Sequence, residues 1–368
     1  MSTPLRIGFY VHYHGMGHKN RTEAIMRSMA LAVSPSPITY AVTSRAESMR
    51  WRLDPPPTII DLPCDDDQVP DAGMQRRDDV DALHYAPLWT DTITRRVANY
   101  TAWLNQTRPD VMVVDVSSEI SMLTRLASVP QIVMRQHGHR DDPGHRSAYQ
   151  AAECLLAPFP ECMEDDVTPE WVKNKTRYLH GFNRLPIEPT STDDRRRRVV
   201  CVMVGRGGNA LGNEALEQLA HAAEHYDVRV LGRSGDSQAT NLTYRGWVDD
   251  VQSELANADV VLSSAGHNSV MELGGMRKRF VAVAEDRPFD EQQRKCEVLN
   301  REGLAVGLTK WPQTIDQWRD VIRRAERIDV SKWDAIYDGH GADEAAQIIV
   351  AFAERCRQAA GTTSTPTD

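Results

Sequence analysis

The segment Val260-Val261-Leu262-Ser263-Ser264-Ala265-Gly266-His267-Asn268-Ser269 passes from an apolar, strand-like run through a glycine turn into a helical pattern that continues to Gly274. The same order occurs near the N-terminus, where an apolar run over 5–12 precedes His14-Gly15-Met16-Gly17-His18 and a predicted helix over 20–32. Strand, glycine turn and helix in this order are typical of parallel α/β folds. Both turns are then expected at the carboxyl ends of strands, where open α/β sheets bind ligands.

The alternation of strand and helix patterns continues through the whole chain. Further strands are predicted over 38–43, 58–62, 111–115, 130–134, 154–157, 199–204, 228–231, 242–244, 259–262 and 280–283, with helices over 86–106, 214–225, 251–257 and 268–274. A Pro/Ser/Thr-rich stretch and four arginines over 186–198 are typical of a linker. We therefore predict two Rossmann-like, doubly wound α/β domains facing a central cleft, over 1–190 and 191–342, and a closing helix with a flexible tail over 343–368.

Composition excludes several classes of protein. The chain has 368 residues, of which 41% are hydrophobic and 26% charged, as expected for a globular two-domain protein. Its net charge of -9 is spread over both halves, so nucleic acid is not an expected partner. No apolar run approaches the roughly 20 residues of a transmembrane helix, and no signal peptide is visible, which predicts a cytoplasmic protein. The six cysteines form no C-x-x-C pair, so no zinc site or disulfide framework is expected.

The first turn predicts a proton-transfer site. Gly15 and Gly17 could begin a dinucleotide-binding motif, but Asn20 occupies the position of its third small residue, which disfavours a nicotinamide or flavin cofactor. His18 follows at once, and it could either cap the helix or act as a general base on a hydroxyl. Asp115, at the end of a predicted strand, is the expected orienting carboxylate, with Glu119 as the second choice.

The second turn predicts an anion site. Backbone amides at a helix start, with side-chain donors beside them, suit a diphosphate; the residues concerned are Gly266, His267, Asn268 and Ser269. Glu272, one and a half turns further on, could accept two ribose hydroxyls. A polar helix cap is the alternative interpretation. Arg206, in the glycine-rich turn over 205–209, could also reach the phosphates.

The two turns and the segments around them resemble the motifs of nucleotide-sugar glycosyltransferases with the two-domain GT-B fold. The stretch from Ala265 to Glu272 resembles the G-x-N-S-x-x-E centre of the plant-type UDP-sugar signature. Residues 244–250 and 258–261, with the later Asp290-Glu291-Gln292-Gln293, are similar to the bacterial enzymes that add N-acetylglucosamine to the lipid-linked peptidoglycan precursor. Gly17-His18 followed by Arg21 is similar to the N-terminal turn of the family.

The resemblance implies an inverting, metal-independent hexosyltransferase with a nucleotide sugar, of UDP type, as co-substrate and no other cofactor. His18 would be the base, oriented by Asp115. The backbone near Val248 would meet the nucleobase. The donor's remaining contacts would be Gly17, Gly266, Asn268 and Ser269 at the diphosphate, Glu272 at the ribose, and Asp290 or Glu291 with Gln292 and Gln293 at the sugar. Two departures are that Ser264 replaces the first histidine of the plant signature, and that Lys295 or Cys296 stands where an asparagine is common.

Two other functions share this fold and stay open at this point: a UDP-sugar 2-epimerase, and a non-catalytic partner subunit. The acceptor, a small molecule or a lipid-linked one, is not encoded in these motifs, although loops over 64–81 and 137–145 are the expected acceptor-binding segments. Trp89, Tyr85 and Trp103 are expected in the core rather than in that site. The acidic runs over 65–67 and 164–166 are expected to be solvated rather than metal-binding.

Overall fold

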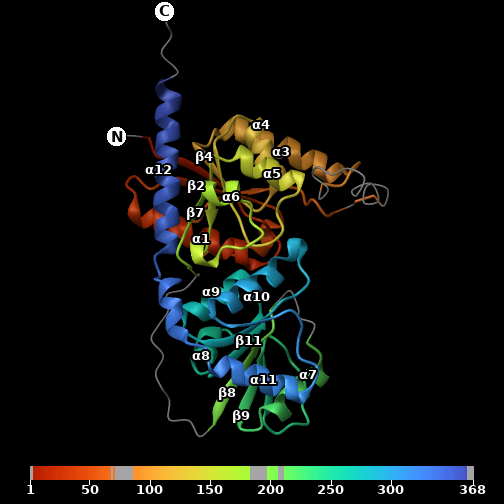
Figure 1. Cartoon of the computed structure of the whole chain (residues 1–368). Coiled ribbons are helices and arrows are strands. Elements are labelled where there is room, and N and C mark those ends of the chain that lie inside the picture. The colour runs from red at the N-terminus through yellow and green to blue at the C-terminus, as the bar shows by residue number, and fades with distance from the viewer. Residues whose placement is uncertain (1–2, 68, 71–85, 183–196, 206–210, 363–368) are drawn as a thin grey trace, which may run out of the picture.

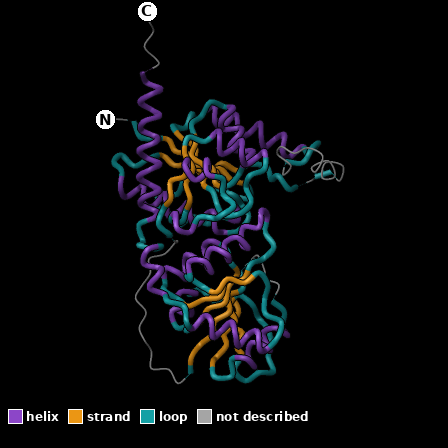
Figure 2. The backbone as a smooth tube through the Cα atoms, viewed as in Figure 1, coloured by secondary structure: helices purple, strands orange, loops and turns teal. Residues whose placement is uncertain are grey.

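The chain forms two α/β domains, each built on one parallel sheet with helices on both faces (Figures 1 and 2). This computed structural model describes residues 3–67, 69–70, 86–182, 197–205 and 211–362. The predicted α/β class with two doubly wound domains is confirmed. The predicted boundary at 190/191 lies outside the described residues, as does most of the tail predicted over 361–368, whose first two residues belong to the closing helix in the structure.

The first domain holds a seven-stranded sheet in the order β3-β2-β1-β4-β5-β6-β7. Every neighbouring pair is parallel. The elements are β1 (Arg6–Tyr10), α1 (Met16–Ala32), β2 (Ile38–Thr43), η1 (Ala46–Ser48), β3 (Thr58–Asp61), α3 (Asp91–Thr107), β4 (Val111–Asp115), α4 (Ser118–Leu126), β5 (Gln131–Met134), α5 (Pro143–Ala151), β6 (Cys154–Ala157), η3 (Glu161–Met163), α6 (Glu170–Lys175) and β7 (Thr176–Tyr178).

The second domain holds a six-stranded parallel sheet in the order β10-β9-β8-β11-β12-β13. Its elements are β8 (Arg198–Met203), α7 (Asn213–Ala222), β9 (Tyr226–Leu231), β10 (Leu242–Gly246), α8 (Val251–Ala256), β11 (Val260–Ser264), α9 (His267–Gly275), β12 (Arg279–Val283), η4 (Pro288–Asp290), α10 (Glu291–Glu302), β13 (Val306–Leu308), α11 (Ile315–Glu326), η5 (Val330–Ala335) and α12 (Gly341–Thr362).

Strand order places the two predicted turns at equivalent points of the two sheets. In the first sheet the order reverses between β1 and β4, and in the second between β8 and β11. Ligands of doubly wound folds bind beyond the carboxyl ends of the strands at such a reversal. The turn after β1 leads to His18, β4 ends at Asp115, and the turn after β11 contains Gly266. The topology therefore collects the predicted residues at the switch points.

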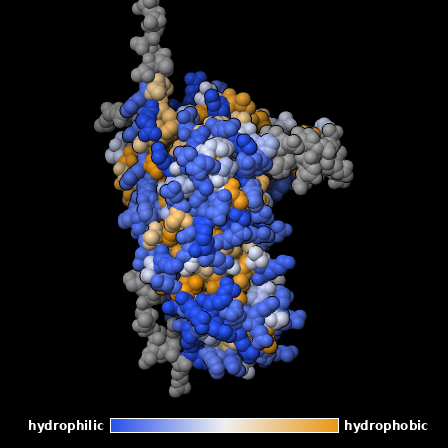
Figure 3. Space-filling view, in the orientation of Figure 1, coloured by the Kyte–Doolittle hydropathy of each residue, from blue (hydrophilic) through white to orange (hydrophobic). Residues whose placement is uncertain are grey.

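The central strands of both sheets, such as β4, β11 and β12, are buried on both faces, as expected for parallel strands covered by helices, whereas the edge strands β3 and β10 are partly exposed. In β1, Ile7 and Phe9 pack into one cluster with α1 and α12, whereas Tyr10 packs on the opposite face near α3. Adjacent residues of β8 divide in the same way between two clusters, one of them formed with α7 and α11. The outer face shown in Figure 3 is mainly hydrophilic.

Helix α12 returns from the second domain to the first, where it packs against α1 and β4 (Figure 1). Arg357 fixes it there through two hydrogen bonds to the carboxylate of Asp110, at 3.0 and 2.5 Å. The same guanidinium donates to the backbone oxygens of Thr3 and Pro4. The segment that closes the second domain is thus anchored on the first. No helix among the described residues has the length and apolar character required to cross a membrane.

Two predicted helices begin at different residues in the structure. Helix α1 starts at Met16 rather than at residue 20, because Gly15 takes a positive φ of 79° and completes the turn within one residue. His18 therefore lies inside the first helical turn. Helix α3 starts at Asp91 rather than at residue 86, after an extended Thr90.

The three aromatic residues predicted to lie in the core have different outcomes. Trp103 is buried as expected, whereas Trp89 is exposed and Tyr85 lies outside the described residues.

Helix α9 is seated directly on η5, and one glycine makes this possible. A Cβ at Gly274 would collide with the indole ring of Trp333, which is fully buried. We expect Gly274→Ala to lower the free energy of unfolding, because overpacking costs about 1–3 kcal/mol and the helix-propensity gain of about 1 kcal/mol offsets only part of it. Urea unfolding measures the change. Gly361→Ala, within α12 and where a Cβ meets nothing within 4 Å, is the control; equal stability of both variants would contradict this packing.

Candidate functional site

The N-termini of α1 and α9 meet at the boundary between the domains (Figure 1). The Asn268 side-chain amide donates to the backbone oxygen of Gly17 at 3.2 Å, and a Cβ at Gly17 would lie only 3.3 Å from the same nitrogen. Both helices have a glycine N-cap without a side-chain cap and no acidic residue in the first turn. Their uncapped N–H groups and positive dipole ends therefore face one region, which favours an anion there.

His18 and Asp115 are in direct contact beside this boundary. Nδ1 of His18 lies 2.9 Å from Oδ2 of Asp115, although 97 residues separate them in the chain. Asp115 is the last residue of β4 and its side chain is buried, whereas 18% of the His18 side chain is exposed. The carboxylate thus holds the imidazole from the protein side and leaves its other edge accessible.

Charge around Asp115 determines the tautomer of His18. Burial raises the pKa of Asp115, but Arg21 and His18 outweigh it and hold that pKa below its ordinary value. Asp115 lies 2.9 Å from Nδ1 of His18, and Nη2 of Arg21 lies 3.2 Å from it. An ionised carboxylate can only accept hydrogen bonds, and Nη2 donates at shorter distances to Asp115, so we assign the proton to Nδ1 of His18 and the lone pair to Nε2. A neutral imidazole with a free Nε2 can accept a proton from a hydroxyl. Nearby His12 is neutral, since burial and the adjacent His18 and His14 lower its pKa to about 3.

Arg21 connects this pair to the second domain. Its Nη2 donates to both oxygens of Asp115, at 2.7 and 2.6 Å. When the amide of Gln136 is oriented to satisfy both neighbours, its oxygen accepts from Arg21 and its nitrogen donates to Oε1 of Glu291 at 3.1 Å. Oε2 of Glu291 accepts from Arg140 at 3.0 Å. A continuous polar network therefore runs from the carboxylate beside His18 to the start of α10.

In the second domain, His267 and Lys295 form a buried pair behind the turn of α9. Nζ of Lys295 lies 3.2 Å from Nδ1 of His267. Burial and the nearby Lys295 hold the pKa of His267 well below its ordinary value, so its ring is neutral and accepts from the ammonium. Asn268 and Ser269 follow in the first turn of α9 and are partly exposed. Glu272, one turn further along the helix, is also partly exposed.

The other residues predicted for the donor site are spread along the second domain. Val248 follows β10 and packs against a core cluster. At the start of α10, Asp290 is exposed and faces His139 of the first domain at 3.9 Å. Gln292 is buried and accepts from the backbone N–H of Glu285, whereas Gln293 is exposed. Arg206 lies outside the described residues. The structure therefore brings the α9 turn to His18 and gives Glu291 and Gln292 protein partners of their own.

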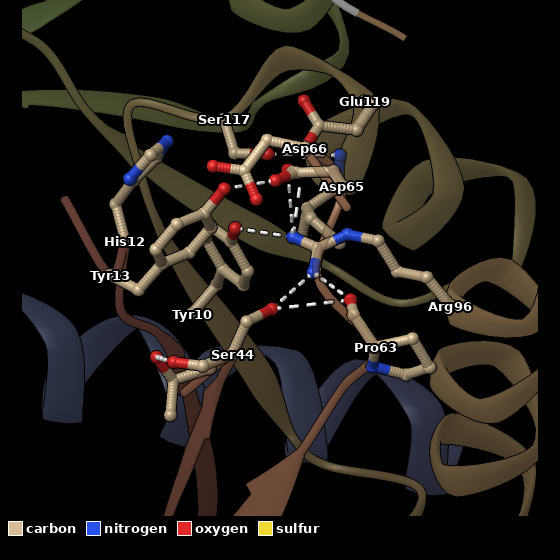
Figure 4. Close-up of polar contacts among 12 residues, drawn as sticks. Tyr10, His12, Tyr13, Ser44, Pro63, Asp65, Asp66, Arg96, Ser117 and Glu119 are labelled. Atoms are coloured by element: carbon tan, nitrogen blue, oxygen red, sulfur yellow. Dashed lines mark hydrogen bonds and ion pairs between the residues drawn. The ribbon is translucent and has the colours of Figure 1, made fainter. Parts of the chain in front are cut away.

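A second polar cluster lies beside His12 in the first domain (Figure 4). Buried Arg96 donates to Ser44 at 2.6 Å, to the backbone oxygen of Pro63 and to Tyr10, and it pairs with Asp65 and Glu119 at 3.5 and 3.8 Å. Burial raises the pKa of Glu119. Glu119 is thus an Arg96 partner, and the carboxylate that contacts His18 is that of Asp115.

The acidic run over 164–166 differs from the solvated segment predicted from the sequence, whereas Asp66 and Asp67 of the run over 65–67 are exposed as predicted. Asp65 is only partly exposed and accepts from the hydroxyl of Tyr13. Glu164 and Asp165 are buried, because Arg135 pairs with the first and Arg294 with the second at 3.1 Å. Only Asp166 is exposed in that run, and it pairs with Arg301. The arginines that hold these acids come from distant segments, which the local charge pattern does not reveal.

Three residues of the site, Arg21, Gln136 and Arg140, make contacts that the sequence analysis did not predict. Arg21 is one helical turn after His18, at the i, i+3 spacing that makes the two side chains neighbours. That spacing could have indicated its position, but its pairing with Asp115 depends on the sheet order. Gln136 and Arg140 follow β5, in the loop expected to bind an acceptor, and they face the other domain instead.

Comparison with known proteins agrees with this architecture. Residues 199–317 match the glycosyltransferase family 28 C-terminal domain. A curated relative from Acidovorax sp. (strain JS42), the UDP-N-acetylglucosamine--N-acetylmuramyl-(pentapeptide) pyrophosphoryl-undecaprenol N-acetylglucosamine transferase, is 25% identical over 265 residues. That alignment covers 67% of this chain and 62% of the relative, so the chain spans less than two thirds of the relative's length.

Solved structures show the same fold over nearly the whole chain. The glycosyltransferase of kitacinnamycin superposes with a TM-score of 0.70 at 14% identity, covering 95% of this chain and 100% of that one. MurG from Acinetobacter baumannii superposes with a TM-score of 0.65 at 12% identity, covering 95% and 100%. The fold is therefore the GT-B fold of these glycosyltransferases.

Proposed function

We propose that this chain, which carries a glycosyltransferase family 28 C-terminal domain on a GT-B fold, transfers a sugar from a nucleoside diphosphate sugar to an acceptor hydroxyl with inversion. One observation carries the proposal: the uncapped N-terminus of α9 touches the turn that presents His18, through Asn268 and Gly17. A group that takes a proton and a cradle that favours an anion thus lie side by side. Sugar transfer from a diphosphate leaving group requires both.

In the proposed reaction, Nε2 of His18 takes the acceptor proton while the acceptor oxygen attacks the anomeric carbon. The bond from that carbon to the diphosphate breaks on the opposite face, and its electron pair leaves with the nucleoside diphosphate. Asp115 accepts from Nδ1 and stabilises the imidazolium that forms. The amide groups at the start of α9 stabilise the departing charge.

The donor contacts are proposed along the second domain. The diphosphate lies at the turn from Gly266 to Ser269, and the ribose hydroxyls at Glu272. Val248 supplies the nucleobase contact, for which uracil is the first choice. Asp290, Glu291, Gln292 and Gln293, which stand together at the start of α10, are the residues proposed to meet the sugar. Support for this arrangement is the family 28 C-terminal domain, which spans all of them.

The acceptor is proposed to lie in the first domain, on the side of His18 lined by His12, Tyr13 and Asp65. These side chains belong to the cluster of Figure 4, and the His12 and His18 rings are 5.5 Å apart. Polar groups in this position suit an acceptor that offers several hydroxyls. A small molecule and the exposed sugar of a lipid-linked molecule both meet that description.

Donor binding and transfer can be tested without knowing the natural acceptor. We expect one nucleoside diphosphate of a panel of UDP, TDP, GDP and ADP to raise the melting temperature, and its sugar conjugates to be hydrolysed slowly or transferred to polyol acceptors.

Helix termini and protein cations supply the positive charge in this proposal, so activity in 5 mM EDTA is expected to equal activity with Mg²⁺. Product analysis by NMR separates the candidates, since a 2-epimerase would change the donor sugar without an acceptor. No stabilisation by any of the four nucleotides would contradict the proposal.

A further inference from the structure

Lys295 is a lysine with no exposed surface at the boundary between the domains. It belongs to α10, and its Nζ has one hydrogen-bond partner among the described residues, Nδ1 of His267 at 3.2 Å. No carboxylate of the described residues forms an ion pair with it. A buried ammonium without a carboxylate is costly, so its position calls for an explanation.

The charged and titratable groups around Lys295 do not supply a matching anion. They are Glu291 and Cys296 on its own helix, Arg21 on α1, His267 on α9, and His137 and Arg140 in the loop after β5. Burial raises the pKa of the Cys296 thiol to about 12, so it is neutral. Glu291 is already engaged by Arg140 and Gln136, and Arg21 by Asp115. Both histidines are neutral, because burial holds the pKa of each well below its ordinary value. The Glu291–Arg140 pair and the Asp115–Arg21 pair are each neutral. The positive charge of Lys295 therefore has no matching negative charge among these groups.

A second observation points to a ligand in the same place. Nε of Arg21 is buried and has no hydrogen-bond partner among the described residues. Arg21 and Lys295 approach the turn of α9 from opposite domains, and that turn begins with an uncapped helix N-terminus. Both cations lie close enough to His267, the first residue of α9, to lower its pKa, and each has donors without a partner among the described residues. Together with the uncapped N-terminus of α9 they form a site for an anion.

We propose that Lys295 binds the diphosphate of the donor and neutralises it as it becomes the leaving group. This inference rests on the proposed function and adds a residue to it. Lysine acts here as a point charge, and the ammonium stays protonated while the bond between the anomeric carbon and the diphosphate breaks. The chain would therefore use a protein cation of its own at the leaving group.

Binding of uridine, UMP and UDP to the full chain tests the proposal, with thymidine, TMP and TDP in parallel. We expect Lys295→Met to weaken the better diphosphate at least tenfold, the monophosphate less, and the nucleoside less than twofold, as measured by calorimetry at pH 7. Lys310→Met removes an exposed lysine of the same domain and should change none of them. Lys295→Met leaves no charge unpaired, so it should melt no lower than the wild type.

Proton uptake gives a second readout that a purely structural lysine would not move. Burial lowers the pKa of Lys295 to about 8, with Glu291 opposing and Arg21 adding to the effect. A diphosphate beside it raises that pKa, so wild-type protein should take up a proton on binding UDP or TDP at pH 8.5, and Lys295→Met should not. Diphosphate affinity of Lys295→Met within twofold of the wild type would overturn the proposal and leave the proposed function standing. Failure of the wild type to bind either diphosphate would overturn both.

Discussion

Replacing His18 with alanine is expected to lower kcat by about 10²–10⁴-fold and to leave the affinity for the donor nucleotide within a few-fold of the wild-type value. The reason is geometric. His18 Nδ1 is held by Asp115, and the exposed edge of the ring is the one that can receive a proton. Removing the ring deletes the proton acceptor, whereas the amides of α9 and the buried lysine behind them stay in place.

Sugar transfer measured in single turnover, together with calorimetry of nucleotide binding, separates these two effects. His225→Ala, which removes a highly exposed histidine of the second domain, is the matched control and should behave as wild type. His12→Ala tests the neighbouring ring, whose lowered pKa makes it unsuitable as the base and whose removal should affect acceptor KM more than kcat. Turnover of His18→Ala within a few-fold of the wild type would show that another group accepts the proton.

The fold and half of this site could be predicted because they depend on local pattern and strand order. The apolar runs mark the strands, and a glycine turn after a strand marks the start of a helix. Residues at the carboxyl ends of neighbouring parallel strands converge, which is why Asp115 could be expected near His18 across 97 residues of chain. The sequence pattern was wrong about where α1 begins, since Gly15 allows the helix to start four residues earlier than predicted.

Contacts between the domains could not be predicted in the same way. Arg140 and Glu291 are 151 residues apart and belong to different domains, so no periodicity relates them. Their pairing depends on how the two domains are placed, which α12 and the meeting of α1 with α9 help to determine. The same holds for Lys295. In the sequence it is one charged residue of a polar helix, and only the packing of α10 against His267 removes it from water.

Asp115→Asn is expected to have two separate effects, a loss of activity and a loss of stability. An amide can donate to Nδ1 of His18 and so favour the wrong tautomer, and in Ser-His-Asp enzymes the equivalent change lowers kcat by about 10⁴-fold. The same substitution leaves Arg21 buried without its carboxylate, and breaking a buried ion pair costs about 3–5 kcal/mol. One carboxylate affects both activity and stability because its oxygens accept hydrogen bonds from His18 and from Arg21.

A double variant separates the two effects. Arg21→Met combined with Asp115→Asn removes the unpaired charge, so it should recover much of the lost stability in urea unfolding and none of the lost turnover. The pH dependence of unfolding gives an independent check. Because the pKa of Asp115 is lowered in the folded protein, its stabilisation is present above the ordinary carboxyl range and is lost as the pH falls below about 4. Asp115→Asn should lack that part of the acid destabilisation. Recovery of activity in the double variant would mean that Asp115 serves only to neutralise Arg21, and the orienting role assigned to it would then be wrong.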